Sequence, residues 1–562
     1  MILANEGAGG QPVYILREGS TQSKGRDAQQ FNIMAAVAVA EAVKSTLGPK
    51  GMDKMLVDPT GNVTVTNDGA TILREVQIDH PAAQMIVEVA RAQDDEVGDG
   101  TTTAVVLAGE LLRKASDLMD RQIHPTVIAT GYRMAADKAK ELLQTIAVPV
   151  EKTDRELLEK IAFTAMTGKG AEAEGAMLSK LAVDAVLAVE DAGKVDTDNV
   201  KVEKMVGPGA MASQLIKGIA LGKTRVVENM PKAVSKAKIL LLNASMEIKK
   251  TQVDASIKIK SPQQMKTFLE QEEAMLLKNV EAISKSGANV LFCQKGMDDL
   301  VASHLGKKGI FAIKSVSESD MKKLSRATGA RIVTKIEEID PKDLGYAGIV
   351  EERKVSGDES LTFVEECKNP KAVTLFVRAG TATVMDELER ALHDAIRVVS
   401  VVVEDGKVVP AGGAPEIELS LRLKQYASTI GGREQLAIES FANAMEIIPR
   451  TLAENAGLDP IDMLVSLRSK HEAKNGKNFG LNVYEGKPID MLAAGIIEPL
   501  RVKTQAVGSA AEAAVMILRI DDVIASGGPS EQTISEAKQQ AKRQLAAGRM
   551  GGGMPPGMGG FM

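Results

Sequence analysis

The stretch Val97-Gly98-Asp99-Gly100-Thr101-Thr102-Thr103 lies between two segments with helical periodicity. Its glycines let the backbone approach a ligand closely, and its threonines stand where the next helix begins. Unpaired N–H groups and the helix dipole favour an anion at such a place. Asp99 can either cap this helix or hold a Mg²⁺ ion that bridges phosphates. The stretch therefore predicts a phosphate-binding loop; a capped turn without a ligand is the simpler alternative.

Apolar residues recur at three- and four-residue steps on both sides of this loop, through residues 27–148. This spacing predicts amphipathic helices. Two short β-prone runs flank Asp58–Gly61, whose residues favour a turn, and together they predict one hairpin. The predicted helices run from Asp27 to Gly48-Pro49, from Pro81 to about Glu96, from the loop to about Gln122, and over residues 126–148.

The middle of the chain has a different pattern. Four short apolar runs are separated by helical stretches or glycine-containing turns, which predicts an α/β arrangement with buried strands. Helical periodicity returns over residues 383–403 and 416–470. The four apolar runs are Ile239–Leu242, Val290–Cys293, Ile310–Ile313 and Arg331–Val333.

Length and composition narrow the class of protein. A chain of 562 residues exceeds the usual size of one domain and predicts three or more. Its net charge of −6 argues against a nucleic-acid partner. We find no signal-peptide core and no apolar run of about 18 residues, so we expect no membrane span. Cys293 and Cys367 are too few for a disulfide framework or a zinc site, and we expect buried thiols in the cytoplasm.

Three further side chains carry chemistry that ATP hydrolysis needs. Asp68 follows a predicted strand, Asp394 lies in a helix with an apolar stripe, and Lys169 lies on a turn flanked by two glycines. Taken singly, each has an ordinary alternative: a turn aspartate, an acid at the solvated edge of a helix, and a solvated lysine. Hydrolysis requires a carboxylate that positions water and a metal that neutralises phosphate charge. Asp394, Asp68 and Asp99 could divide that work, although their spacing does not establish that they converge.

Seven segments, in this order along the chain, resemble the motifs of the group II (thermosome-type) chaperonins. The similarity runs from about Gly25 to Ile524, and a Gly/Met-rich tail is also typical of this family. The form of the motifs is similar to that of archaeal thermosome subunits. The segments are Leu47–Leu56, Thr66–Leu73, Val97–Thr103, Thr167–Gly170, Gly412–Glu416, Gly480–Val483 and Glu498–Lys503.

The resemblance implies the chaperonin fold, a multidomain α and α/β architecture. It would comprise a mostly helical equatorial domain, a small intermediate domain, an α/β apical domain with a helical protrusion or lid, and a disordered Gly/Met-rich C-terminal tail. The equatorial and intermediate domains would each be discontinuous. The implied ranges are 1–151 and 411–528 for the equatorial domain, 152–222 and 376–410 for the intermediate domain, 223–375 for the apical domain with its lid at about 246–280, and 529–562 for the end of a helix and the flexible tail.

The predicted lid contains an amphipathic segment. Ile257 and Ile259 alternate with polar residues, and Ser261-Pro262 marks a helix start. Periodicity alone favours a simple packed helix. In the proteins that this chain resembles, the segment closes a cage as a built-in lid, without a separate co-chaperonin. Its apolar stripe consists of Met265, Phe268, Leu269, Leu276, Val280 and Ile283.

The resemblance also implies that ATP or ADP binds with Mg²⁺, with K⁺ as a further candidate ion. Asp394 would position the attacking water with help from Asp68, and Asp99 would hold the Mg²⁺ ion. Lys169 would sense the γ-phosphate. Of the other implied nucleotide-binding residues, Gly48, Gly100, Thr101, Thr102 and Thr103 would cradle phosphates, Gly413, Gly480, Asn482 and Glu498 would line the ribose and adenine, and Pro49, Thr167 and Lys503 complete the set.

The implied function is that of an ATP-dependent chaperone. Copies of this chain, or paralogous subunits, would form two stacked rings of roughly eight that enclose unfolded polypeptides, with the ATPase timing a change of shape. Two alternatives come from other classes of protein. A monomeric Mg-ATP-dependent enzyme acting on a small molecule is disfavoured because Walker and kinase signatures are missing. A passive binding scaffold is disfavoured by the intact set Asp68, Asp99, Lys169 and Asp394.

Overall fold

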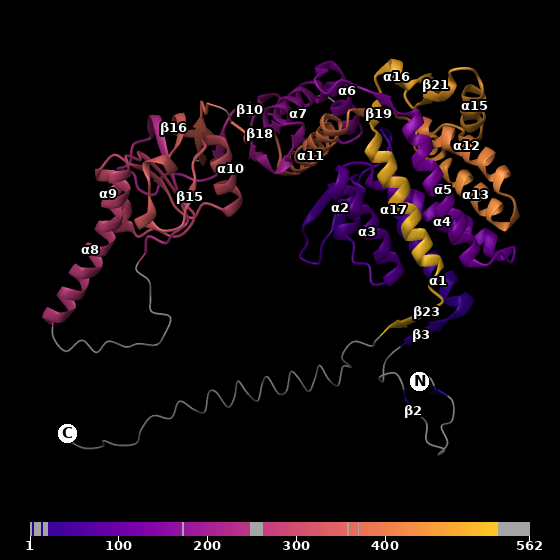
Figure 1. Ribbon diagram of the computed structural model, residues 1–562, viewed down its shortest axis with the longest axis horizontal. Coiled ribbons are helices and arrows are strands. Elements are labelled where there is room, and N and C mark those ends of the chain that lie inside the picture. The colour runs from indigo at the N-terminus through magenta and orange to yellow at the C-terminus, as the bar shows by residue number, and fades with distance from the viewer. Residues whose placement is uncertain are drawn as a thin grey trace.

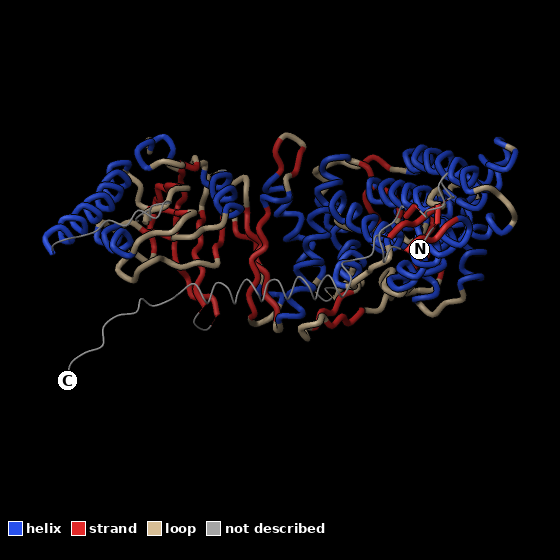
Figure 2. Tube along the Cα trace, turned by 90° about the horizontal axis from the view of Figure 1, so that it is seen from below, coloured by secondary structure: helices blue, strands red, loops and turns tan. Residues whose placement is uncertain are grey.

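The computed structural model describes residues 3–4, 13–14, 21–170, 174–247, 262–356, 359–368 and 370–525. These residues form three bodies in a row: a helical body, a smaller middle body and an α/β body (Figure 1). Helices dominate one end of the row and a strand-rich sheet the other (Figure 2). The predicted Gly/Met-rich tail lies outside the described residues. Among those residues, no helix has the length and apolar character that a bilayer crossing requires.

The helical body is assembled from both ends of the chain. Its aliphatic core joins buried residues of the first 150 positions to those from position 409 onward, and α4 carries the fully buried Leu111 and Leu112. The Tyr132 hydroxyl, also fully buried, donates a hydrogen bond to the Leu111 carbonyl oxygen at 2.8 Å. The helices are α1 (Gly25–Lys44), α2 (Gly69–Glu75), α3 (Pro81–Val97), α4 (Thr101–Asp120), α5 (Pro125–Ile146), α12 (Ala414–Ile430), α13 (Gly432–Met445), α14 (Ile447–Asn455), α15 (Pro460–Glu472), α16 (Met491–Ala494) and α17 (Leu500–Leu518).

The four helices predicted for this part of the sequence are confirmed, with one correction. The first ends at Lys44, before the predicted stop at Gly48-Pro49, and the intervening residues form a turn. The predicted hairpin is also confirmed, since β4 pairs antiparallel with β5. The sequence analysis missed the strands whose partners lie far away in the chain. The strands of this body are β3 (Thr21–Lys24) with β23 (Asp522–Ala525), β4 (Lys54–Val57) with β5 (Val63–Thr66), β6 (Val148–Pro149) with β19 (Lys407–Pro410) and β22 (Ile497–Pro499), and β20 (Phe479–Asn482) with β21 (Lys487–Asp490).

The middle body packs three helices on a three-stranded sheet that the sequence analysis missed. Residues from both sides of the α/β insertion share its core. The predicted division between domains stays a prediction. One of its boundaries, between positions 375 and 376, cuts across β18, and β11 (Ile219–Leu221), predicted for the intermediate domain, pairs with β17 (Glu359–Glu365) of the α/β body. The elements are α6 (Arg155–Met166), α7 (Gly175–Val189), α11 (Ala382–Asp405) and the sheet β10 (Gln214–Ile216), β18 (Val373–Ala379) and β9 (Val200–Val206), with the small hairpin β7 (Glu190–Asp191) and β8 (Lys194–Val195).

The α/β body contains all four predicted apolar runs as strands of one sheet. β12 pairs in parallel with β13 and β15, and β13 pairs in parallel with β14, as expected for buried strands joined through helices. Separate apolar clusters cover its two faces. The strands are β11 (Ile219–Leu221), β12 (Ala233–Leu242), β13 (Val290–Cys293), β14 (Phe311–Ile313), β15 (Ile332–Val333), β16 (Gly345–Ser356) and β17 (Glu359–Glu365), and the helices are α8 (Pro262–Ser286), α9 (Asp299–Lys307) and α10 (Glu318–Thr328).

Helix α8 projects beyond the α/β body at the far end of the molecule (Figure 1). In its C-terminal half, Leu276, Val280 and Ile283 are buried, so the predicted apolar stripe packs there as in an ordinary helix. Other parts of the predicted lid lie outside the description: the positions of Ile257 and Ile259 are not included, nor are the side chains of Met265, Phe268 and Leu269.

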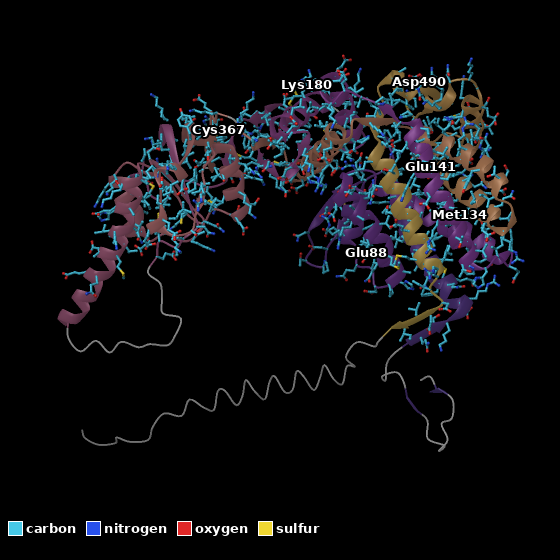
Figure 3. The ribbon with its side chains drawn as sticks, in the orientation of Figure 1. Glu88, Met134, Glu141, Lys180, Cys367 and Asp490 are labelled. Carbon is cyan, nitrogen blue, oxygen red and sulfur yellow. The ribbon has the colours of Figure 1, made fainter. Side chains whose placement is uncertain are left out.

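Both cysteines lie in the α/β body and carry free thiols. Cys293 is buried, as predicted, whereas Cys367, labelled in Figure 3, is only partly buried, which corrects the expectation of two buried thiols. Burial raises the pKa of each thiol to about 11. Both cysteines are therefore protonated and poorly nucleophilic at neutral pH.

The packing around α4 predicts a large difference between two leucine substitutions in the helical body. Leu111→Ala should lower the free energy of unfolding by about 2–5 kcal/mol, because Leu111 is 0% exposed and leaves a cavity. Leu436→Ala is the matched control, because Leu436 is 41% exposed and should cost less than about 1 kcal/mol. Thermal denaturation followed by circular dichroism compares the two, and equal Tm values would contradict the packing.

Candidate functional site

A cavity of about 610 Å³ lies where the helical and middle bodies meet. The middle body contributes residues of α6, α7 and the turn after α6, and Lys180 of that body is labelled in Figure 3. The helical body contributes the predicted phosphate loop and the residues before α12. The predicted site residues that line the cavity are Gly48, Pro49, Asp68, Asp99, Gly100, Thr101, Thr102, Thr103, Thr167, Lys169, Gly413, Asn482, Glu498 and Lys503.

The loop between α3 and α4 depends on its two glycines. Gly98 and Gly100 adopt φ angles of 72° and 76°, in the left-handed region that favours glycine. A Cβ at Gly98 would also lie 2.4 Å from the Arg397 side chain of the middle body. Gly100 is the N-cap residue of α4 and no side chain caps it, so the alternative in which Asp99 caps this helix is wrong. An uncapped helix start that lines a cavity suits an anion.

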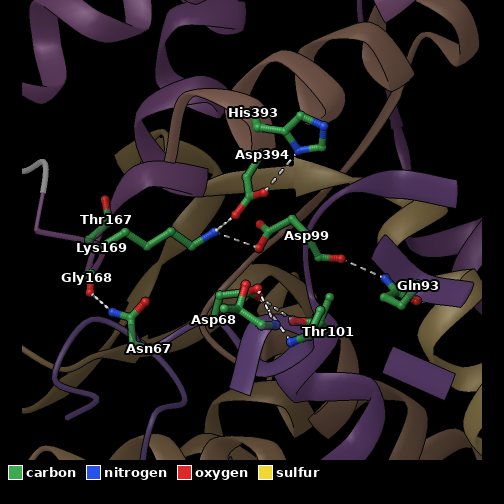
Figure 4. Close-up of polar contacts among 12 residues, drawn as sticks. Asn67, Asp68, Gln93, Asp99, Thr101, Thr167, Gly168, Lys169, His393 and Asp394 are labelled. Atoms are coloured by element: carbon green, nitrogen blue, oxygen red, sulfur yellow. Dashed lines mark hydrogen bonds and ion pairs between the residues drawn. The ribbon is translucent and has the colours of Figure 1, made fainter. Parts of the chain in front are cut away.

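Lys169 joins the two bodies inside this site. Its ammonium lies 2.6 Å from Asp394 Oδ2 on α11 and 3.1 Å from Asp99 Oδ1 in the phosphate loop (Figure 4). The Lys169 side chain is 16% exposed and that of Asp394 is 10% exposed. Lys169 is therefore not a solvated lysine, and Asp394 does not lie at the solvated edge of its helix. Lys169 thus brings together Asp99 and Asp394, two of the three carboxylates in the hypothesis for ATP hydrolysis.

Burial and neighbouring charges set the ionisation of this group. Burial raises the pKa of Asp394, although the Lys169 ammonium opposes that shift. Burial alone would lower the pKa of Lys169, but the carboxylates of Asp394 and Asp99 outweigh it and raise the pKa. One ammonium thus faces several carboxylates, and the site carries an excess of negative charge. Such a site attracts a cation.

Asp68 connects the hairpin to the start of α4. Its carboxylate caps α2 by accepting hydrogen bonds from the backbone N–H groups of Thr71 at 2.8 Å and Ala70 at 3.3 Å. It also accepts one from the Thr101 hydroxyl at 3.1 Å. Burial raises the pKa of Asp68, but these hydrogen bonds and the charge of Lys169 outweigh it and lower the pKa. Asp68 is thus the turn aspartate of the simpler alternative, where it caps α2, and also an ionised neighbour of the phosphate loop.

The residues fit a Mg²⁺ ion that arrives with phosphates. Within the described ranges, no three His, Cys, Asp or Glu side chains are grouped closely enough to hold a metal by themselves. Mg²⁺ commonly takes only one or two carboxylates and completes its shell with water and phosphate oxygens. Asp99, which lines the cavity beside the uncapped start of α4, offers such a carboxylate.

Two predicted residues do not line the cavity. Asp394 reaches it only through Lys169. Gly480 acts through packing: a Cβ there would lie 2.6 Å from the carbonyl oxygen of Ala411 and 3.0 Å from that of Gly412. Its lack of a side chain lets β20 lie against the segment that leads into α12. The Asn482 Oδ1 atom accepts hydrogen bonds from backbone N–H groups of its own turn.

Lys503 lies at another part of the cavity wall, between two carboxylates. Its ammonium is 2.7 Å from Glu416 Oε1 and 3.0 Å from Glu498 Oε1. Burial raises the pKa of Glu498 to about 7, against the lowering effect of Lys503. Burial alone would lower the pKa of Lys503, but Glu416 and Glu498 outweigh it and raise the pKa.

The sequence analysis missed four polar residues of this region. Asn67 donates its side-chain N–H to the Gly168 carbonyl oxygen, and His393 lies 3.7 Å from Asp394 (Figure 4). Gln93, fully buried, donates to the carbonyl oxygens of Asp99 at 2.8 Å and of Val502 at 3.2 Å. In the sequence, Asn67 and His393 each stand next to a predicted aspartate, and Glu416 is the last residue of the motif Gly412–Glu416. Gln93 was detectable only as a polar residue on the apolar face of α3.

A three-body chain with a helical base, an α/β far end and this cavity between two bodies has the architecture of a chaperonin subunit. The chain belongs to the TCP-1/cpn60 chaperonin family, whose family model matches residues 39–527. This result confirms the family resemblance and the predicted fold class.

Curated relatives and a solved structure agree with this assignment. The chain is 58% identical over 523 residues to thermosome subunit beta of Archaeoglobus fulgidus, covering 92% of this chain and 96% of that protein. It is 57% identical over 550 residues to thermosome subunit beta of Methanothermobacter thermautotrophicus, covering 98% and 99%. It also resembles the open-state monomer of a group II chaperonin from Methanococcoides burtonii, with 49% identity and a TM-score of 0.58, covering 75% of this chain and all of that one.

The burial of Glu498 predicts a pH-dependent difference in stability between the parent protein and Glu498→Gln. Because the folded-state pKa is raised to about 7 from the usual 4.5, the unfolded chain ionises first as the pH rises. The parent therefore loses stability between about pH 4.5 and 7, whereas the glutamine variant does not lose this contribution. The Tm of Glu498→Gln minus that of the parent should increase across this window and then level off. A constant difference, measured by scanning calorimetry, would contradict the shift.

Proposed function

We propose that this chain is a subunit of an ATP-driven chamber for protein folding. Two stacked rings of roughly eight subunits, this chain alone or with paralogous chains, would enclose unfolded polypeptides in the cytoplasm. The observation that carries the proposal is the Lys169 ammonium, which pairs with Asp99 of the helical body and Asp394 of the middle body. A phosphate group that competes for this ammonium would act on the contact between the bodies, and so convert a binding event into a movement.

The residues divide the work of hydrolysis as follows. The backbone of Gly48 and the first turn of α4 would bind the phosphates, and Asp99 would hold Mg²⁺, which would neutralise phosphate charge. The Lys169 ammonium lies against the Asp394 carboxylate. A terminal phosphate would draw the ammonium toward itself and release the Asp394 carboxylate. The carboxylate then orients a water molecule and accepts its proton, a task for which a raised pKa is suited. Asp68 stays ionised beside the loop and assists.

The α/β body, at the far end of the molecule, would bind the unfolded polypeptide. Helix α8 extends outward from the α/β body, and its Met275 is 62% exposed. Apolar side chains in such a position suit both an unfolded polypeptide and contacts between lids. We infer that the segment including α8 forms a built-in lid, so that no separate co-chaperonin is needed. Movement of the middle body through Lys169 and Asp394 would carry the α/β body with it.

The role assigned to Asp394 predicts a separation of binding from turnover. Asp394→Ala should bind ATP with Mg²⁺ but hydrolyse it about a hundredfold more slowly, because it removes the group that orients the water. Asp386→Ala is the matched control. Asp386 lies on the same helix, but its side chain is 52% exposed and pairs with Lys204. Phosphate release and equilibrium nucleotide binding measure the two properties. Near-normal hydrolysis by Asp394→Ala would refute the assignment.

The chamber predicts a particle far larger than one chain. In light scattering and negative-stain images, the protein should form double rings of roughly 16 copies, or ~1 MDa for a chain of 59.6 kDa. Addition of Mg-ATP should change the shape of the ring ends without changing the mass. A monomer or small oligomer that hydrolyses ATP, and that does not assemble with a paralogous subunit, would instead support a monomeric enzyme. Rings without hydrolysis would support the passive scaffold.

A further inference from the structure

A fully buried amide, that of Gln93 on α3, lies between the phosphate loop and α17, and the mechanism above does not use it. Its Nε2 atom donates to the carbonyl oxygen of Asp99 at 2.8 Å and to that of Val502, in the first turn of α17, at 3.2 Å. Figure 4 shows the Asp99 carbonyl oxygen directed at the Gln93 amide. One side chain thus links the phosphate loop to the start of α17, and both contribute residues to the cavity wall.

The two acceptors determine which end of the amide faces them. Both are carbonyl oxygens, which only accept hydrogen bonds, so the NH₂ group of Gln93 must face them. The Oε1 atom of Gln93 is buried and has no hydrogen-bond partner among the described residues. A buried polar atom without a partner costs free energy, and an apolar side chain would avoid that cost. The two donated hydrogen bonds are therefore what the amide contributes at this position.

The hydrogen bond to Asp99 sets the orientation of the peptide unit that joins Asp99 to Gly100. The described chain contains no cis peptide bond, and a trans unit carries its C=O and its N–H on opposite sides. Because the Asp99 carbonyl is directed at Gln93, the Gly100 N–H points to the other side of the unit. Turning the unit over would change ψ of Asp99 and φ of Gly100, a change that a glycine tolerates. The Gln93 amide is a constraint against it.

The second hydrogen bond anchors the amide to a long helix. Val502 is 1% exposed, and its carbonyl group belongs to the first turn of the 19-residue helix α17. The loop backbone also packs directly against both partners, since a Cβ at Gly100 would lie 2.9 Å from Val502 Cγ1 and 3.2 Å from Gln93 Nε2. The amide is thus held on one side by helix backbone, while on the other side it holds the loop.

We propose that Gln93 is a positioning residue that keeps the N–H of the peptide unit between Asp99 and Gly100, and not its C=O, turned toward the phosphate groups of the nucleotide. This inference rests on the proposed function. Gly100 lines the cavity at the uncapped start of α4, where N–H groups complement an anion. A unit turned over would present a carbonyl oxygen, whose partial negative charge repels phosphate. Gln93 does not line the cavity, so it acts on the ligand only through the loop.

The test compares ADP, which carries phosphate groups but is not hydrolysed, with adenosine, which carries none. Gln93→Met keeps the length of the side chain and removes both donors. On the assembled protein with Mg²⁺, it should weaken ADP binding roughly tenfold or more, because the peptide unit loses the hydrogen bond that orients it. Adenosine binding should stay nearly unchanged. Titration calorimetry measures the affinity for ADP, and competition against ADP measures the weaker affinity for adenosine.

Steady-state hydrolysis gives a second measurement on the same variant. Gln93→Met should raise the KM for ATP and change kcat little, because the loop holds the phosphates alike before and during the reaction. A lower kcat with an unchanged KM would place the effect of Gln93 on the chemical step and overturn the proposal.

A second variant and a control separate the amide's role from general damage to the fold. Gln93→Glu keeps the shape of the side chain. As a carboxylate it repels the Asp99 carbonyl, and as a neutral acid it offers one hydrogen to two acceptors, so in either state it should weaken ADP binding selectively. Gln84→Met is the matched control. Gln84 lies on the same helix and donates to the Ile78 carbonyl oxygen at 2.8 Å, but it is exposed, so both affinities should match those of the parent.

Each remaining outcome counts for or against the role of Gln93. Selective loss of ADP binding in the Gln93 variants, with none in Gln84→Met, supports it. Equal losses of ADP and adenosine binding would indicate a purely structural role and overturn it, as would unchanged ADP binding. Particle mass shows whether each variant assembles, and if Gln93→Met does not, Gln93→Glu decides. Failure of the parent to bind ADP would instead overturn the proposed function itself.

Discussion

One partly buried ammonium, that of Lys169, shared between Asp99 and Asp394, constrains the rest of the site. The two carboxylates belong to different bodies, so neither body can move against the other without separating a charge from its partner. Separating such a partly buried ion pair costs free energy unless another charge takes its place. A phosphate group can take that place, because it is an anion that binds where an uncapped helix begins. On the proposed function, the contact between the bodies is therefore where a phosphate ligand would act.

The backbone around this ammonium is as constrained as the charges. A Cβ at Gly168 would lie 3.0 Å from Pro49 Cα and 3.1 Å from the Gly48 carbonyl oxygen, and Gly168 itself has a φ of 84°. The turn that carries Lys169 thus rests directly on the opposite body, and Asn67 donates a hydrogen bond to it. Because the two backbones touch here, a small shift of the Lys169 turn must displace the Gly48-Pro49 loop, and both line the same cavity.

The sequence predicted local elements well and distant contacts poorly, for a physical reason. Helices such as α3 and the buried strand β13 depend on periodicity within the element, which the sequence displays directly. The sheet of β9 and β18 joins segments on either side of a whole body, and no local pattern encodes its register.

The same limit applies to the prediction of the candidate site. The motifs indicated Asp99, Lys169 and Asp394 one by one, but their convergence is a property of the junction. Gln93 was missed because its partners are backbone atoms of distant residues.

Two charge clusters beside the cavity repeat one arrangement of charge. Lys169 is shared by Asp99 and Asp394, and Lys503 is shared by Glu416 and Glu498. In each case one ammonium faces two carboxylates. In the Lys503 cluster, burial raises the pKa of Glu498 to about 7, so this carboxyl is partly protonated at neutral pH and the excess negative charge lies mainly in the Lys169 cluster. A cation beside Asp99 would offset that excess, whereas hydrogen-bond donors would pair with carboxylate oxygens without neutralising them. A Mg²⁺-bound nucleotide offers both, which supports the proposed ligand.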